Sequence, residues 1–283
     1  MPPVLRAALW MLGTLTSLAL MAIAGRELSA ELSTLQILFF RSAIGLVIIL
    51  AVIWRVGRHH LTTLQPGLQI LRNAAHYIGQ FGWFYGISLL PLAQVFALEF
   101  TMPVWATLLA PLLLKEQITP RRALVVVIGF VGILIVVRPG LVTISPAALA
   151  VLMAAVGYAF AYTLTKKLTR TDTALAIVFY MCLVQLPLGL IPSLFDWVNP
   201  SAAMWPWILA VSVTGLSAHY SLARAFAEAD AIVVVPMEFL RLPLIAVAGL
   251  LFYGEPLDPW VLGGAAVIFA GNFLNILGER KRV

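Results

Sequence analysis

The sequence predicts an all-α polytopic membrane protein whose ten transmembrane helices form two inverted five-helix repeats. Its composition is the first observation behind this prediction: the chain of 283 residues is 62% hydrophobic and only 11% charged, with a mean hydropathy of +1.00. Apolar runs of about 18 residues or more recur from end to end, which is the signal for membrane-spanning helices. The other two observations are the distribution of basic residues and a set of residues that recurs in both halves of the chain.

Polar links and Pro/Gly breaks place the ten spans, and no sustained two-residue alternation favours strands. The span 5–25 ends in AIAG, as a signal peptide can, but its run from Val4 to Gly25 is long for a signal core. We therefore keep it as a helix. The predicted spans are 5–25, 33–54, 68–90, 92–114, 120–138, 146–165, 173–194, 205–226, 231–253 and 257–277.

Lysine and arginine set the orientation of these spans. With the N-terminus in the cytoplasm, most basic residues fall in inner segments, whereas the outer loops hold only Arg26 and Arg138. This bias follows the positive-inside rule and predicts that both termini are cytoplasmic. It also explains the pI of about 9.8 better than a nucleic-acid partner does.

Matched residues reveal an internal duplication. Glu99-Phe100, Glu116 and Pro120 each recur 139 residues later, as Glu238-Phe239, Glu255 and Pro259. Ala75-His76-Tyr77 likewise matches Ala218-His219-Tyr220 at an offset of 143. We predict one five-helix repeat in residues 1–140 and a second in 141–283. Because five is odd, the second repeat enters the membrane upside down, as in many secondary transporters.

The duplicated helix ends resemble those of a known family. The stretches LLAPLLLKEQIT and GLLFYGEPLD, together with the arginine of FFRSAIGL (Arg41), resemble the EamA family of the drug/metabolite transporter superfamily. The resemblance covers essentially the whole chain. It implies a solute transporter that works by alternating access in a bacterial inner (plasma) membrane. The family's substrates include amino acids, nucleotide-like metabolites, vitamins and drugs, and VVVPMEFLRLPLIAVAGLLFYGE is most similar to uptake permeases.

Glu99 and Glu238 are the first candidate site residues, because a carboxylate inside a membrane span is costly and normally faces a bundle interior. Each could couple protons, balance a cationic solute or form a structural ion pair. Arg241 lies three residues after Glu238 and can pair with it along the helix. Glu99 has no basic residue within four positions, so its partner must come from another helix or from the solute. We therefore expect the solute or proton at Glu99.

The third span carries a second candidate group. Arg72, His76, Gly79 and Trp83 follow a 4-3-4 spacing and share one helix face. Arg72 could bind a carboxylate or phosphate, or extend to the cytoplasmic surface. His76 could relay protons or be simply hydrogen-bonded, and its twin His219 favours a functional role.

Aromatic side chains and prolines accompany these groups. Pro103 and Pro243 follow the two glutamates and predict kinked helices beside the site. Aromatic residues lining a central cavity would suit a planar solute by stacking, the alternative being ordinary packing. The aromatic candidates are Tyr77, Phe100, Trp105, Tyr158, Tyr162 and Tyr220.

The predicted function is a secondary transporter of a small organic metabolite, with proton coupling through Glu99 or His76 as one option. A non-transporting receptor or scaffold is the alternative, as is an exporter of amino acids or drugs in place of an uptake permease. No HExxH, GxSxG or phosphate-loop motif points to an enzyme, and Cys182 and the four histidines lack metal-ligand spacing. We expect no catalytic residue, metal or cofactor. The expected partners are a solute and the lipid bilayer, with a homodimer left open.

Overall fold

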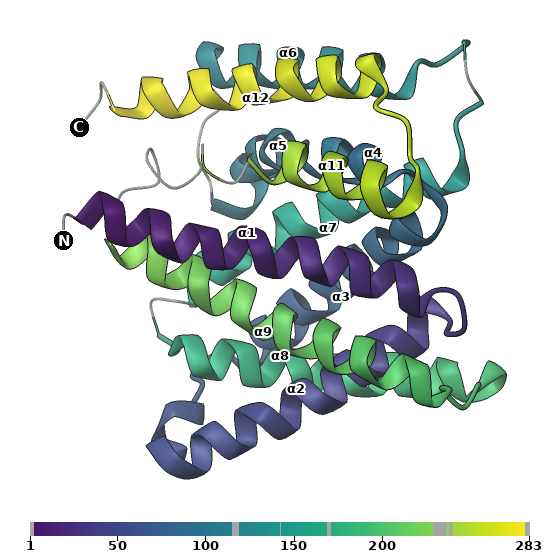
Figure 1. The fold of residues 1–283 in the computed structure, drawn as a ribbon. Coiled ribbons are helices and arrows are strands. Elements are labelled where there is room, and N and C mark those ends of the chain that lie inside the picture. Colours follow the sequence, from purple (N-terminus) through teal and green to yellow (C-terminus); the bar gives the residue numbers. More distant parts are fainter. Residues whose placement is uncertain are drawn as a thin grey trace.

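A computed structural model describes residues 3–114, 119–141, 143–168, 171–228, 237 and 240–280. The regular elements in this part of the chain are helices (Figure 1). The long ones are α1 (Pro3–Leu28), α2 (Thr34–Val56), α3 (Pro66–Leu89), α4 (Leu92–Glu99), α5 (Met102–Leu114), α6 (Pro120–Val137), α7 (Pro146–Leu168), α8 (Ala174–Ser193), α9 (Trp205–Glu228), α11 (Arg241–Tyr253) and α12 (Pro259–Arg280). Short 3₁₀ turns are η1 (Arg58–Leu61), η2 (Leu194–Asp196) and η3 (Ala202–Met204).

Local sequence signals set many of the helix ends. Ser33 and Thr173 accept hydrogen bonds from the backbone N–H groups of Gln36 and Ala176, and so cap α2 and α8. Proline opens α3, α6, α7 and α12, where its missing N–H costs no hydrogen bond. Gly254 ends α11 with a φ of +63°, a left-handed conformation that glycine adopts without strain.

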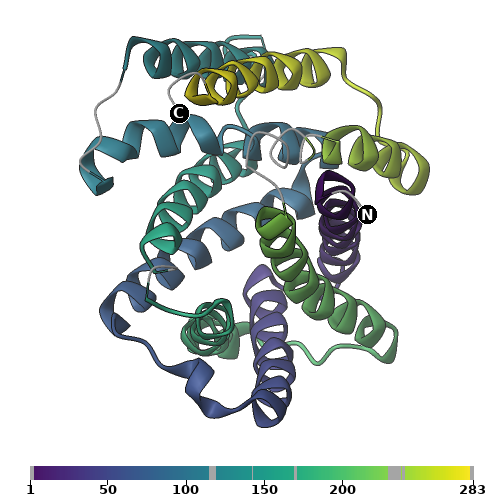
Figure 2. The same cartoon turned by 90° about the vertical axis from the view of Figure 1, so that its left-hand side faces the viewer.

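The helices run roughly side by side, with the chain termini at the same end of the bundle (Figure 1). Each main contact joins a helix from before residue 140 to one from after it: α1 packs on α9, α2 on α8, α3 on α7, α4 on α11 and α6 on α12. Figure 2 shows α6 and α12 lying side by side as an outer layer over α4, α5 and α11. The two halves of the chain are therefore interleaved.

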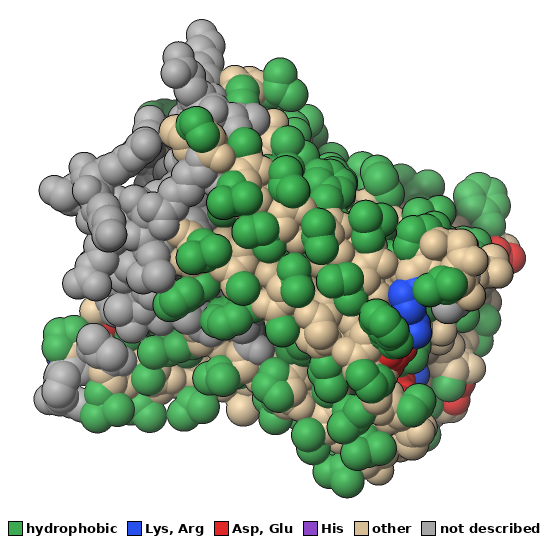
Figure 3. All heavy atoms as spheres, turned by 90° about the horizontal axis from the view of Figure 1, so that it is seen from above, with side chains coloured by type: hydrophobic (Ala, Val, Ile, Leu, Met, Phe, Trp, Pro, Cys, Tyr) green, Lys and Arg blue, Asp and Glu red, His purple; other side chains and the backbone are tan. Residues whose placement is uncertain are grey.

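Five stretches are long and apolar enough to cross a membrane: Leu5–Leu28, Thr34–Val56, Leu92–Leu109, Pro146–Thr165 and Ala174–Asp196. Shorter apolar helices occupy Ala123–Val137, Arg241–Tyr253 and Pro259–Leu274. Helices α3 and α9 have 24 residues each but carry more polar side chains. Figure 3 shows the face formed by α6 and α12 densely covered with hydrophobic side chains, the charged ones lying near one edge.

The predicted span 92–114 is two helices, because the chain breaks at Phe100 and Thr101 between α4 and α5. Pro103 has no N–H to bond the carbonyl four residues earlier. Neighbouring carbonyls at the break have side-chain partners: the Thr101 hydroxyl donates to the Leu98 carbonyl at 2.6 Å, and Asn272 Nδ2 donates to the Phe100 carbonyl at 3.3 Å. Most of the first half of the predicted span 231–253 lies outside the described residues.

Glycines bring α3 and α7 into close contact. A Cβ at Gly79 would lie 2.7 Å from the Tyr158 ring, and a Cβ at Gly82 would press into the Ala150 carbonyl. Gly86 meets Val151 in the same way. Small residues thus allow the two backbones to approach closely.

Candidate functional site

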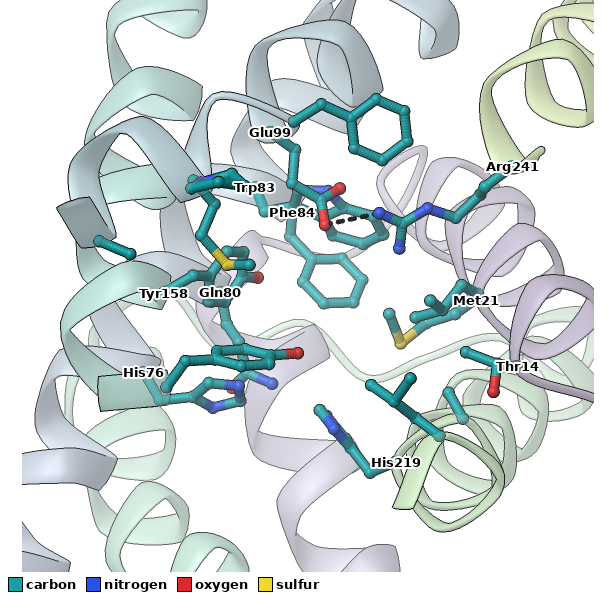
Figure 4. A pocket seen from close by; sticks show the side chains of 18 of the residues that line it. Thr14, Met21, His76, Gln80, Trp83, Phe84, Glu99, Tyr158, His219 and Arg241 are labelled. Atoms are coloured by element: carbon teal, nitrogen blue, oxygen red, sulfur yellow. Dashed lines mark hydrogen bonds and ion pairs between the residues drawn. The ribbon is translucent and has the colours of Figure 1, made fainter. Parts of the chain in front are cut away.

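A cavity of about 360 Å³ lies at the centre of the bundle, within the size range of small-molecule sites. Most of its lining is apolar or aromatic, and a few polar side chains converge on it (Figure 4). Helices from both halves of the chain contribute. The lining residues are Thr14, Leu18, Met21, Arg41, His76, Gln80, Trp83, Phe84, Glu99, Phe100, Met102, Pro103, Ala106, Tyr158, Tyr162, Ala218, His219, Leu222, Arg241 and Asn272.

An ion pair crosses one side of this cavity. Arg241 Nη2 lies 3.0 Å from Glu99 Oε1, and Trp83 Nε1 donates to Glu99 Oε2 at 2.8 Å. The Arg241 guanidinium also lies over two rings, 4.9 Å from the centroid of Phe96 and 5.1 Å from that of Phe100. The contact joins α4 of the first half to α11 of the second.

This pairing changes the expectation for the two glutamates. The partner that Glu99 required from another helix is Arg241, the residue expected to pair locally with Glu238. Glu238 itself lies outside the described residues. Arg241 is the first residue of α11 and reaches across to the last residue of α4, a long-range contact that spacing along one helix cannot reveal.

The histidine twins meet in the cavity. The His76 and His219 ring centroids are 5.9 Å apart, and the Tyr158 ring lies 5.5 Å from that of His76. Gln185 Nε2 lies 3.0 Å from His76 Nδ1. Because His76 comes from α3 and His219 from α9, the repeated Ala-His-Tyr motif places one histidine from each half beside the other (Figure 4).

Arg72 is buried, 6% exposed, but does not line the cavity. Its Nε donates to the Thr165 hydroxyl at 3.0 Å, and its Nη1 donates to Asn73 Oδ1 at 2.6 Å. Of the two alternatives for Arg72, extension to the cytoplasmic surface is not what the structure shows. One helical turn separates it from His76, and that distance leaves it behind the cavity wall.

Three predicted aromatic residues point elsewhere. The Tyr77 hydroxyl donates to the Leu188 carbonyl, and Tyr220 is 58% exposed and packs edge-on against Trp10. Each follows a histidine by one residue, which turns its side chain about 100° around the helix. Trp105 donates to Thr101 and packs on Phe130. Phe100, Tyr158 and Tyr162 do line the cavity.

The site also contains polar residues that were not candidates, among them Arg41, Gln80 and Asn272. Arg41 belongs to the stretch FFRSAIGL that carries the family resemblance, and an arginine inside an apolar span is itself a signal of function. Gln80 follows His76 by one turn, so the same face pattern could have included it. Asn272 carries no such local signal.

Glu255, the duplicated glutamate in the link between α11 and α12, contacts the start of α4. Glu255 Oε2 accepts from the Leu92 N–H at 2.8 Å, at the first residue of α4. Its Oε1 lies 3.0 Å from Arg26 Nη1. A carboxylate at a helix N-terminus is favourable, so Glu255 caps α4.

Comparison with known proteins gives a consistent result. A model of the EamA-like transporter family matches residues 5–138 and 145–277. The chain is 25% identical over 272 residues to an S-adenosylmethionine uptake transporter of Rickettsia prowazekii, with 96% of this chain and 92% of that protein covered. It is 30% identical over 284 residues to a riboflavin transporter of Vibrio cholerae, covering 98% and 95%.

Two further matches add detail. The chain is 29% identical over 248 residues to a pseudopaline exporter of Pseudomonas aeruginosa, with 86% of each chain covered. A solved crystal structure has a TM-score of 0.68 at 16% sequence identity and covers 97% of this chain and 98% of its own. At that identity the structural match shows a shared fold alone.

Proposed function

The chain belongs to the EamA-like transporter family, and we propose that this multi-pass bacterial membrane transporter moves a small organic metabolite by alternating access at the Glu99–Arg241 cavity. It is not an enzyme. The observation that carries the proposal is the cavity itself, which is enclosed by helices of both halves and crossed by an ion pair between them. A solute that separates the pair would release one half from the other.

The proposed topology has ten spans in two inverted repeats, residues 1–140 and 141–283, with both termini in the cytoplasm. The cross-half packing supports this, because exchanging the halves converts the α1–α9 contact into the α7–α3 contact. The α2–α8 and α6–α12 contacts map onto themselves under the same exchange. Sites at the interface of inverted repeats are common in secondary transporters.

The proposed solute has a planar, aromatic portion. The rings of Trp83, Phe84 and Tyr158 line the cavity, and such rings favour stacked or edge-on contacts with another ring. S-adenosylmethionine and riboflavin, named for two of the relatives, both carry a planar heterocycle. They are the first solutes to test, in both directions, because a third relative is named as an exporter.

Proton coupling through Glu99 or His76 is part of the proposal. Protonation of Glu99 would remove the charge that holds Arg241 and so link the proton to the movement of α4 against α11. In proteoliposomes, Glu99→Gln should lose the stimulation of solute uptake by a pH gradient and retain solute exchange. A Glu99→Gln variant that responds to the gradient as the wild type does would exclude this role for Glu99.

The transport test uses the purified full chain in proteoliposomes loaded with buffer. We expect labelled S-adenosylmethionine or riboflavin to enter faster than in protein-free vesicles, and excess unlabelled solute to compete. Solute binding without any movement across the vesicle membrane would instead favour a receptor or scaffold.

A further inference from the structure

Among the described residues, the charges that line the cavity do not balance. Arg41, Glu99 and Arg241 contribute to its wall, and Glu99 and Arg241 form an ion pair with each other. Arg41 is only 4% exposed and makes no ion pair with a carboxylate in the part of the chain that the structure describes. A buried charge without a counter-charge is costly, so a retained one points to a ligand.

Neutral groups hold Arg41 in place. When the Gln80 amide is oriented to satisfy both of its neighbours, its oxygen accepts from Arg41 Nη1 at 2.5 Å and Nη2 at 3.0 Å. Its nitrogen then donates to Gln185 Oε1 at 2.7 Å, and Gln185 in turn contacts His76. These amides position the guanidinium without neutralising it.

The absence of a side chain at Gly215 leaves space for the Arg41 guanidinium. A Cβ at Gly215 on α9 would lie 2.8 Å from Arg41 Nε and 3.1 Å from Nη2. The buried Nε has no hydrogen-bond partner among the residues that are described. The contacts of the nearby Arg72, with Thr165 and Asn73, are likewise neutral. This side of the cavity therefore carries positive charge that described protein groups leave uncompensated.

We propose that Arg41 is an oxyanion-binding residue, so that the transported solute carries a carboxylate or phosphate group that binds its guanidinium. The inference rests on the proposed transport function and specifies its substrate class. A guanidinium is a fixed fork of donors that matches either group. His76, His219 and Tyr158 lie around the cavity beside it and contact the rest of the solute.

Arg241 is the other guanidinium in the cavity, but it is already engaged. Its Nε also has no described hydrogen-bond partner, but Glu99 balances its charge and the rings of Phe96 and Phe100 lie against it. A solute oxyanion there would have to displace a carboxylate. Arg41 has no such competitor in the described chain. The solute oxyanion therefore binds at Arg41 and not at Arg241.

Binding to the purified full chain tests this with two pairs of probes that differ in an oxyanion. One pair is S-adenosylmethionine and its decarboxylated form, and the other is flavin mononucleotide and riboflavin. We expect the oxyanion-bearing member of at least one pair to bind about 10- to 100-fold more tightly, as charge-assisted hydrogen bonds would allow. Arg41→Gln should reduce this ratio to about one by weakening binding of the oxyanion-bearing member.

Arg55→Gln is the matched control, because Arg55 is exposed near the end of the same helix and should leave the ratio intact. Arg41→Lys keeps the positive charge but not the planar set of donors, so it should show a binding ratio between those of the wild type and Arg41→Gln. It replaces Arg41→Gln in the test if that variant does not fold. The proposal is overturned if the wild type shows no preference in either pair or binds none of the four probes. A preference that survives in Arg41→Gln overturns it equally.

Transport of the same probes separates the two proposals. An Arg41-dependent preference without movement into vesicles would overturn the transport proposal and support the oxyanion site. Transport of a probe whose binding does not depend on Arg41 would support the transport proposal and overturn the oxyanion site.

Discussion

At the scale of single residues, the Glu99–Arg241 pair lies where the backbone does not favour it. Glu99 is the last residue of α4 and Arg241 the first of α11, so each charge faces the helix end of its own sign. Their stabilisation must come from each other, from Trp83 and from the two rings under Arg241. Such a pair is suited to separation during a transport cycle.

Removing one member of the pair should be costly. Glu99→Gln leaves Arg241 buried without its counter-charge. We expect the free energy of unfolding to fall by up to about 3 kcal/mol, which is the lower end of the range for breaking a buried ion pair. The lower end applies because the Glu99 side chain is 16% exposed to the cavity. Thermal or denaturant unfolding in detergent would measure it.

The double variant Glu99→Gln/Arg241→Gln provides the control, since it removes both charges and should recover part of the lost stability. Asp196→Asn, at an exposed position, should have little effect. Strictly additive losses in the double variant would show that the two side chains are not energetically coupled.

Asp172, in the link between α7 and α8, is a second residue that contributes to the stability of the fold. Burial alone would raise its pKa, but hydrogen bonds from Thr63, Gln69, Thr171 and the Leu64 backbone lower the pKa of Asp172 below its usual 3.8. Gln69 Nε2, for example, donates to Asp172 Oδ2 at 2.7 Å. The carboxylate ties the start of α3 to the other half of the chain.

A lowered carboxyl pKa stabilises the folded state above the unfolded-state pKa, and this contribution is lost as pH falls through the folded-state value. We therefore expect wild-type stability to decline below about pH 4 through this group. Asp172→Asn should be less stable at pH 7, by about 1–3 kcal/mol, and should lack that part of the decline. Unfolding measured across pH 3–7 checks this, and parallel curves would contradict it.

At the scale of elements, close glycine contacts decide how α3 and α7 pack. Gly82→Leu would drive a side chain into the Ala150 carbonyl, and overpacking of this kind costs about 1–3 kcal/mol or more. We expect a clearly lower melting temperature. Gly263→Ala on α12, where a Cβ meets nothing within 4 Å, should match or exceed the wild type. A Gly82→Leu variant as stable as the wild type would show that the contact is not close in solution.

The broken fourth span is the element that most affects the site. In a continuous helix over 92–114, Glu99 would lie in the helix interior. The break after Glu99 instead places it at a helix end, where it faces Arg241. Pro103 supplies the sequence cause. Asn272 and Thr101 make the break tolerable by bonding nearby carbonyls, which membrane interiors require.

At the scale of the whole molecule, the proposed topology predicts which ends of the bundle face the cytoplasm. In a Cys182→Ser background, His59→Cys should react with a membrane-impermeant maleimide only after cells are permeabilised. Asn199→Cys should react in intact cells, because an odd number of predicted spans separates the two exposed positions. Equal labelling of both positions in intact cells would overturn the proposed orientation.

Much of the site could be predicted because its residues are chemically rare in a membrane. Glu99, His76 and His219 stand out against an apolar background and recur at fixed offsets, so burial and a cavity position were reasonable expectations. The faces of adjacent residues were harder to assign. Tyr77 and Tyr220 belong to the same motif as the histidines, yet one step along a helix turns them out of the cavity.

The sequence by itself determined the membrane class, the apolar spans and the family resemblance, because hydropathy, charge bias and duplication are properties of the linear chain. Only the tertiary structure decided that Arg241 pairs with Glu99, that Arg72 lies behind the wall and that Arg41 faces the cavity without a described counter-charge. The reason is physical: these outcomes depend on contacts between helices, such as α4 with α11 and α3 with α7. Such contacts are set by how helices from both halves pack against one another and not by spacing along any one of them.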